Sequence, residues 1–268
     1  MVAAISEFGE STARDRLRAE RAEGAVRDLE RDRRETFGAT LAHEIRQPLA
    51  TLLAAVEVIR RAPDSATTTR ATDVMARQIG QMSRVVEDLL DAARWACGKV
   101  TLRRHRLDVR DVLKEAAMDI AAAVAERQHE LLVSTASEPL WVDADRQRLH
   151  QVFSNLLRNA VKYTNPGGRI SLAADRGPGT ATLRVSDTGR GIESEALPHI
   201  FDLFSQVSPS EDGGLGIGLS VVREIVGLHD GRIEARSEGR GYGSEFIVTL
   251  PLAPAPIPVN AAPAPGRC

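Results

Sequence analysis

Apolar side chains recur every three or four residues along two long stretches near the start of the chain. The first set runs from Phe37 to Ile59 and the second from Met75 to Ala93. This spacing predicts two amphipathic helices, and the Pro-containing segment 62–65 between them predicts a turn. We therefore expect a helical hairpin. Because a single hairpin has too little surface to bury both apolar stripes, we expect two copies to pair as a dimeric four-helix bundle.

Beyond Gly98 the pattern changes to short strand-like runs that alternate with helices. The strands are expected at residues 100–102, 170–174, 182–186, 233–237 and 244–250, the last two as a hairpin. The helices are expected at residues 109–127, 146–163 and 218–229. This mixture predicts an α/β sandwich domain, so the whole chain is a multidomain α and α+β protein.

These patterns divide the chain into four regions. Residues 1–35 are rich in Arg and Glu and predict a charged helical extension, either solvated or a coiled coil. The hairpin is expected over residues 36–97 and the α/β domain over residues 98–251. Residues 252–268 are rich in Ala and Pro, a composition that is typical of a semi-rigid linker or tail.

Composition narrows the class of protein. The 268 residues are 43% hydrophobic, which is enough for a core, and the net charge of −2 gives no drive for binding nucleic acid. Two cysteines exclude a disulfide framework. The start of the chain has no basic segment of a secretory signal. The longest apolar run, residues 116–125, is too short for a membrane helix of ~20 residues. We expect a cytoplasmic protein with no direct membrane span.

The first candidate site lies on the first hairpin helix, where Glu44 follows His43 and Pro48 comes five residues after the histidine. Helical geometry places His43 away from the apolar stripe, so its imidazole should face solvent. An exposed imidazole beside a carboxylate can act as a nucleophile, with the carboxylate as its base. An ordinary surface histidine explains the same residues.

The second candidate site lies on the helix expected at residues 146–163. Asn155, Asn159 and Lys162 are spaced to share one face of this helix. Amide oxygens suit a hard cation and an ammonium suits an anion, so this face fits a Mg²⁺–phosphate cluster. A row of solvated polar side chains is the alternative.

Two glycine-containing segments complete the candidate chemistry. Asp187 shares the inward phase of its strand with Leu183 and Val185, where a carboxylate needs a donor such as an adenine amino group. Gly189 and Gly191 follow it and allow close approach of the backbone, although a plain turn explains them as well. Further on, the glycines of residues 213–218 precede a helix, whose N-terminus can bind phosphate.

Taken in this order, the motifs resemble the core of sensor histidine kinases of two-component signalling over about residues 30–251. Residues 43–49 are similar to the phospho-acceptor box, and residues 155–163 to the N box. Residues 187–191, 200–204 and 214–218 are similar to the first glycine box, the F box and the second glycine box. The last four boxes are shared with related ATPases such as gyrase and Hsp90. The histidine box distinguishes the kinases from these proteins.

The resemblance implies that His43 attacks the γ-phosphate of ATP and that Glu44 is its base. It also implies that Asn159 is the Mg²⁺ ligand, supported by Asn155, and that Lys162 contacts phosphate. The remaining members of the implied site contact the nucleoside, read the adenine, or shape the pocket and lid. They are Tyr163 for the nucleoside, Asp187 for the adenine, and Gly189, Gly191, Gly214, Gly216, Gly218 and Leu219 for the pocket and lid.

The implied partners are a second copy of the chain, a response-regulator receiver domain and a separate sensor protein. Gln47 stands where many family members carry Thr or Asn, which puts phosphatase activity in doubt. Gln206 stands where many carry a phosphate-binding arginine, so Lys162 or Mg²⁺ would neutralise that charge. A related ATP-driven clamp, a serine kinase of the same superfamily and a degenerate docking scaffold are the alternative functions.

Overall fold

The computed structural model describes residues 38, 41–42, 45–61, 64–96, 101–205 and 215–255. These residues form two compact units. The first contains the described residues up to Leu89 and those of 204–216. The second contains the described residues of 90–203 and those from Ile217 onward.

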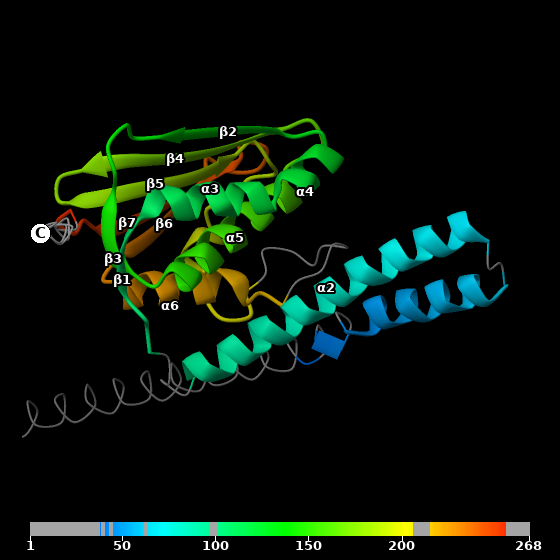
Figure 1. Cartoon of the computed structure of the whole chain (residues 1–268). Helices are drawn as coiled ribbons and strands as arrows, with labels where there is room; N and C mark the ends of the chain where they lie inside the picture. The colour runs from blue at the N-terminus through cyan, green and yellow to red at the C-terminus, as the bar shows by residue number, and fades with distance from the viewer. Residues whose placement is uncertain are drawn as a thin grey trace, which may run out of the picture. The chain divides into compact units, whose positions relative to one another are not determined.

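The first unit contains most of the helical hairpin that the apolar pattern predicts (Figure 1). Residues 45–61 are helical, and α2 spans Ser65–Ala96. Asp64 begins α2, because its carboxylate accepts a hydrogen bond of 2.9 Å from the backbone N–H of Thr67. Hydrogen bonds from the side chain and from the backbone of Thr67 lower the pKa of Asp64 below its ordinary value.

Among the described residues of the hairpin, the buried positions are Pro48, Ala55 and Ala71. Ala55 and Ala71 are 7% exposed, whereas Leu49, Ile79 and Val86 are 43%, 53% and 50% exposed. The last three belong to the apolar stripes of the two helices. A single copy therefore leaves much of each stripe in contact with solvent.

The second unit is built on a sheet with the strand order β2-β4-β5-β7-β6 (Figure 1). Its strands are β2 (Glu130–Thr135), β4 (Arg169–Gly177), β5 (Thr180–Asp187), β6 (Arg232–Arg236) and β7 (Ser244–Pro251). β2 is parallel to β4, and the other neighbouring pairs are antiparallel. A separate two-stranded sheet pairs β1 (His105–Asp108) with β3 (Trp141–Ala144).

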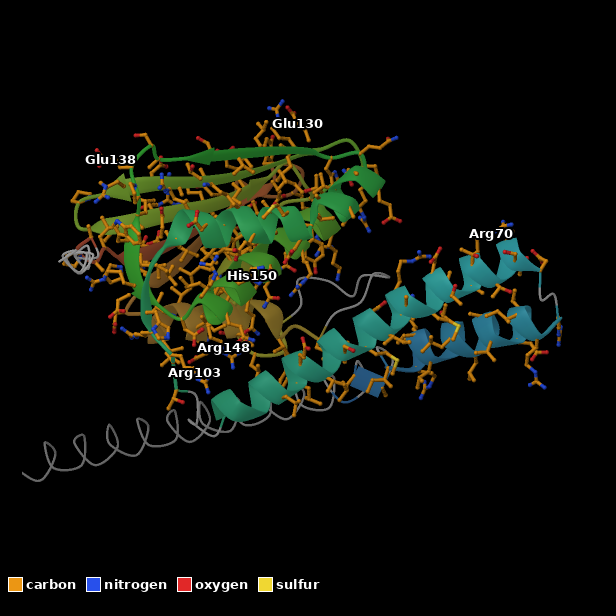
Figure 2. All side chains as sticks on the ribbon, viewed as in Figure 1. Arg70, Arg103, Glu130, Glu138, Arg148 and His150 are labelled. Atoms are coloured by element: carbon orange, nitrogen blue, oxygen red, sulfur yellow. The ribbon has the colours of Figure 1, made fainter. Side chains whose placement is uncertain are left out.

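Helices cover one face of the larger sheet, as Figure 1 shows. They are α3 (Val109–Asp119), α4 (Ala121–Glu126), α5 (Arg146–Tyr163) and α6 (Gly218–Leu228). α5 is the central helix: Phe153, Leu156 and Leu157 on it are fully buried, as the apolar pattern predicts. Figure 2 labels His150 on this helix, whose Nε2 atom lies 2.9 Å from Asp119 at the end of α3. This contact joins α5 to the end of α3.

Some of the elements expected from the sequence are wrong, and some elements of the structure are not among those expected. Residues 101–104 form no strand, and the first strand of this unit is β1 instead. β2 and β3 were not expected at all. The helix expected at 109–127 is broken at Ile120, which caps α3 and begins α4. The helix expected at 146–163 and the β6–β7 hairpin are confirmed.

None of the helices in the described part of the chain combines the length and the apolar character needed to cross a membrane.

Candidate functional site

The site is organised by α5, which begins at the N-cap residue Asp145. Halfway along the helix, Asn155 is 5% exposed, so it is buried rather than solvated. Its side-chain nitrogen donates to the carbonyl oxygen of Gly218 over 3.4 Å, and its side-chain oxygen accepts from the guanidinium of Arg158. Asn155 therefore joins α5 to the beginning of α6. Its expected support of a Mg²⁺ ligand stays a prediction.

Asn159 and Lys162 lie one and two turns further along α5, and both are half-buried. Among the described residues, no hydrogen bond engages the side chain of Asn159. Nor do the described residues contain a cluster of His, Cys, Asp and Glu side chains that could hold a metal ion. Any metal here would thus rely on an amide oxygen of the protein and on oxygens of its ligand. That donor set fits Mg²⁺, which keeps few protein ligands and prefers oxygen.

The end of α5 packs tightly against the segment that follows β5. The backbone N–H of Arg190 donates to the carbonyl oxygen of Tyr163 over 3.0 Å. A Cβ atom at Gly189 would lie 2.3 Å from the same oxygen, so only glycine fits there. The close approach that the glycine permits is therefore to Tyr163. The Tyr163 ring carries the Arg190 guanidinium 4.0 Å from its centroid.

Asp187 ends β5 and is the half-buried carboxylate of the site. Its oxygens accept hydrogen bonds from the hydroxyl of Ser244, over 2.5 Å, and from the backbone N–H of Gly189, over 2.8 Å. Burial raises the pKa of Asp187 above its ordinary value, and the two hydrogen bonds oppose that rise. A carboxylate in this environment gains from a further donor supplied by a ligand.

The turn between β6 and β7 locks this segment in place. Gly241 N–H donates to the carbonyl oxygen of Arg190 over 2.7 Å, and Gly243 N–H donates to that of Gly189 over 3.1 Å. Gly191 has a φ of 71°, and a Cβ atom on it would lie 1.9 Å from the carbonyl oxygen of Gly239. Gly191 therefore serves the contact between two loops, which explains its conformation without a ligand.

The second glycine segment is described only in part. Gly218 begins α6, and a Cβ atom on it would lie 3.9 Å from the Asn155 side chain. The capping residue of α6, Ile217, makes no side-chain hydrogen bond to its first turn, and Leu219 is half-buried on that turn. Gly216 has a φ of 67°.

Four residues singled out from the sequence lie outside the described residues: His43, Glu44, Gln206 and Gly214. The structure brings together Asn155 and Gly218 by one contact, and Tyr163 and Gly189 by another.

Three residues of the site are not predicted by the sequence patterns: Arg158, Arg190 and Ser244. Arg158 and Arg190 lie inside recognised motifs, but no pattern assigned them a contact. Ser244 reaches Asp187 because the register of β5 and β7 places the two residues opposite each other. Such a register depends on the whole sheet, so no local signal identifies Ser244.

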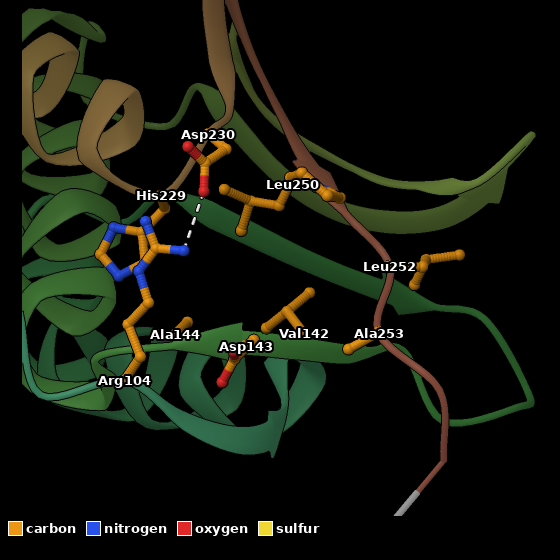
Figure 3. A pocket seen from close by; sticks show the side chains of 10 residues that line it. Arg104, Val142, Asp143, Ala144, His229, Asp230, Leu250, Leu252 and Ala253 are labelled. Carbon is orange, nitrogen blue, oxygen red and sulfur yellow. Dashed lines mark hydrogen bonds and ion pairs between the residues drawn. The ribbon is translucent and has the colours of Figure 1, made fainter.

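A separate pocket lies at the other ends of α5 and α6 (Figure 3). Arg104, His229 and Asp230 line it, and Arg104 pairs with Asp230 over 2.8 Å. No residue of the candidate site lines this pocket. It is therefore distinct from the constellation described above.

Comparison with known protein families gives two matches. Residues 33–98 match the His Kinase A phospho-acceptor domain. Residues 144–254 match the domain described as a histidine kinase-, DNA gyrase B- and HSP90-like ATPase. The second match contains every described residue of the candidate site.

Individual proteins match over most of the chain. Sensor histidine kinase TrcS of Mycobacterium tuberculosis is 35% identical over 240 residues, which cover 85% of this chain and 46% of TrcS. Adaptive-response sensory kinase SasA of Synechococcus elongatus is 32% identical, covering 80% of this chain and 58% of SasA. This chain thus spans about half the length of these curated relatives.

Solved structures give the same result. The catalytic domain of histidine kinase ThkA, nucleotide-free, is 27% identical with a TM-score of 0.51; the match covers 56% of this chain and 96% of that one. Full-length ShkA in complex with AMPPNP is 30% identical with a TM-score of 0.62, over 87% of this chain and 49% of that one.

Proposed function

Because this chain belongs to the sensor histidine kinases of two-component signalling, we propose that it transfers the γ-phosphoryl group of ATP to His43. The observation that carries this proposal is the pairing of two features in one chain. Residues 33–98 match a phospho-acceptor domain, and the second unit presents Asn159, Lys162 and Asp187 on elements that Tyr163 and Gly189 hold together.

The nucleotide would be held by residues of α5 and β5. Asp187 accepts a hydrogen bond from the adenine amino group, and Tyr163 contacts the nucleoside. Lys162 is the residue before the last residue of α5 and meets the phosphates as a point charge. Asn159 provides the amide oxygen for Mg²⁺, which would neutralise charge on the phosphate oxygens when bound.

The transfer itself uses the histidine box. A ring nitrogen of His43 attacks the γ-phosphorus, so that an N–P bond forms while the bond to the bridging β,γ-oxygen breaks and ADP leaves. Glu44 accepts the proton that the imidazole loses. Phosphoryl transfer depends on positioning and on neutralisation of charge, and the residues of α5 and β5 contribute to both.

The remaining steps involve other proteins. We propose that phosphorylated His43 donates its phosphoryl group to an aspartate of a response-regulator receiver domain. The chain would act as a homodimer in the cytoplasm and receive its signal through residues 1–35 or from a separate sensor protein. Gln47, exposed on the first helix, leaves phosphatase activity in doubt.

The proposal is tested by incubating the full chain with γ-labelled ATP and Mg²⁺ beside a His43→Gln variant. We expect label on the parent alone, and this label should be labile in acid and stable in base. Label that survives in the variant would contradict transfer to His43. Hydrolysis of ATP without any labelled protein would instead favour a related ATPase.

A further inference from the structure

Arg190 and Tyr163 form a close cation–π pair at the junction of the first glycine segment and α5. The Cζ atom of Arg190 lies 4.0 Å from the centroid of the Tyr163 ring. The ammonium of Lys162 lies 5.0 Å from the same centroid. Both distances fall within the range of about 6 Å over which a cation is attracted to an aromatic face.

The backbone fixes Arg190 from two sides, so this pair is built into the fold. Its N–H donates to the Tyr163 carbonyl oxygen over 3.0 Å, and its carbonyl oxygen accepts from Gly241 N–H over 2.7 Å. The chain just before Arg190 is equally constrained, because Gly189 leaves no room for a Cβ atom beside Tyr163. The guanidinium therefore starts from a fixed backbone next to the ring.

The guanidinium of Arg190 has no carboxylate partner among the described residues. Other arginines in this unit do: Arg184 pairs with Asp175, and Arg240 pairs with Glu193 over 2.6 Å. Arg190 is also half-buried, whereas the Arg240 side chain is 80% exposed. The described contact of the half-buried Arg190 guanidinium is therefore an aromatic ring and not a surface carboxylate. A cation in this position restricts the movement of the ring.

We infer that Arg190 is a positioning residue for the nucleoside, acting through the ring of Tyr163. This inference rests on the proposed function, in which Tyr163 contacts the nucleoside of ATP. With the guanidinium stacked on it, the ring is held in one orientation before the ligand arrives, which reduces the entropy lost on binding. Arg190 acts on the binding of the nucleoside part of the ligand, so its contribution to the affinity does not depend on the number of phosphates.

The test measures binding of adenosine, ADP and AMPPNP to the full chain, by competition against a fluorescent ATP analogue. Arg190→Ala should weaken all three by a similar factor, about three- to tenfold. Arg190→Lys keeps the charge without the planar group and should fall between the parent and Arg190→Ala. Arg240→Ala, in the neighbouring turn, is the matched control and should bind as the parent does.

Two further measurements separate positioning from general stability. Arg190→Ala should add little to the loss caused by Tyr163→Ala, because the arginine acts through the ring. The chain has two tyrosines, so Tyr242→Phe leaves the ring signals of Tyr163 alone in the NMR spectrum of ¹³C-tyrosine-labelled protein. Arg190→Ala in that background should shift and broaden these signals without ligand, while the midpoint of thermal unfolding stays within error of the parent.

The outcomes are distinct. Unchanged binding of adenosine by Arg190→Ala would overturn the inference while leaving the proposed function intact. A loss that grows with each phosphate would also overturn it, because the guanidinium would then contact phosphate directly. If the parent chain binds no nucleotide at all, the proposed function fails and this inference fails with it.

Discussion

At the scale of single residues, Asp187 shows how the fold prepares a group for a ligand. It continues the inward phase of β5 after the buried residues Leu183 and Val185. Burial raises its pKa, and the hydrogen bonds from Ser244 and Gly189 N–H hold the rise in check. The carboxylate is thus kept as an acceptor in a site that disfavours its charge.

Ser244→Ala tests this balance. The Ser244 hydroxyl favours the ionised carboxylate, so its removal should raise the pKa of Asp187 further. Because the ionised form accepts from the ligand, binding of AMPPNP should be lost at a higher pH than in the parent as the solution is acidified. The measurement is the dissociation constant of AMPPNP across the acid range. The control is Ser186→Ala, which removes a hydroxyl that donates to Glu245 over 3.3 Å. This variant should lose AMPPNP binding at the same pH as the parent.

Asp187→Asn separates binding from stability. A folded-state pKa above the ordinary value means that ionised Asp187 is less favourable in the folded chain than in the unfolded chain at neutral pH. Removing the charge should therefore not lower the free energy of unfolding, measured with urea at neutral pH. Binding of AMPPNP should nevertheless weaken about tenfold or more, because an acceptor for the ligand is lost. A variant that is strongly destabilised would contradict this account of the carboxylate.

At the scale of elements, α5 and α6 run in opposite directions and are joined at both ends of α6. At the beginning of α6, Gly218 contacts Asn155 from the middle of α5. At the end of α6, the ring of His229 accepts from the backbone N–H of Asp145 over 3.0 Å and donates to the carbonyl oxygen of Ile225 over 2.7 Å. Figure 3 shows His229 in the pocket with Arg104 and Asp230. His229 is 3% exposed, so its neutral ring is a structural joint between the two helices.

The sequence predicts the elements that depend on interactions between residues close in the chain. It does not predict those that depend on contacts between distant residues. α5 was predicted at its observed bounds because its apolar period and the N-cap Asp145 are both local. β2 was missed because Leu132 and Val133 remain 44% and 45% exposed at the sheet edge, so the strand has little alternation. In the site, the roles of Arg190 and Ser244 depend on contacts across the sheet and its loops. The spacing of residues along the chain does not indicate such contacts.

The His229 joint predicts a pH dependence of stability. Burial lowers the pKa of His229 below its ordinary value of 6.5; Arg104 reinforces this shift, while Ile225 O, Asp145 and Asp230 oppose it. The unfolded chain therefore takes up the proton first, so the free energy of unfolding should fall as the pH drops below about 6.5 and level off below the folded-state pKa.

His229→Phe should flatten that dependence. It should also lower the free energy of unfolding at neutral pH by about 1–3 kcal/mol, because the N–H of Asp145 loses its buried acceptor. Denaturant unfolding over a pH series measures both effects. His199→Gln, at a residue whose side chain is 61% exposed, is the control and should keep the pH dependence of the parent. If the free energy of unfolding depends on pH in the same way in the parent and in His229→Phe, His229 is not the cause of that dependence.

At the scale of the whole molecule, the two units have different requirements for stability. The α/β unit encloses its own core, with Phe153, Leu183 and Val248 almost fully buried. The hairpin leaves Leu49, Ile79 and Val86 between 43% and 53% exposed along its apolar stripes. Covering such surface is favourable by about 25 cal/mol per Å². A second hairpin offers a matching surface, which supports the homodimer proposed above.

Ile79→Glu should therefore disrupt the dimer while sparing the nucleotide site. Burying the new carboxylate against a second hairpin is unfavourable, so the dissociation constant of the dimer should rise about tenfold or more, as measured by sedimentation. Arg70→Glu, which helical geometry places on the opposite face of α2, should sediment as the parent does. AMPPNP affinity should be unchanged in both variants, because the α/β unit has its own core. A parent chain that sediments as a monomer, or an Ile79→Glu variant that remains dimeric, would show that the exposed stripes are not the interface.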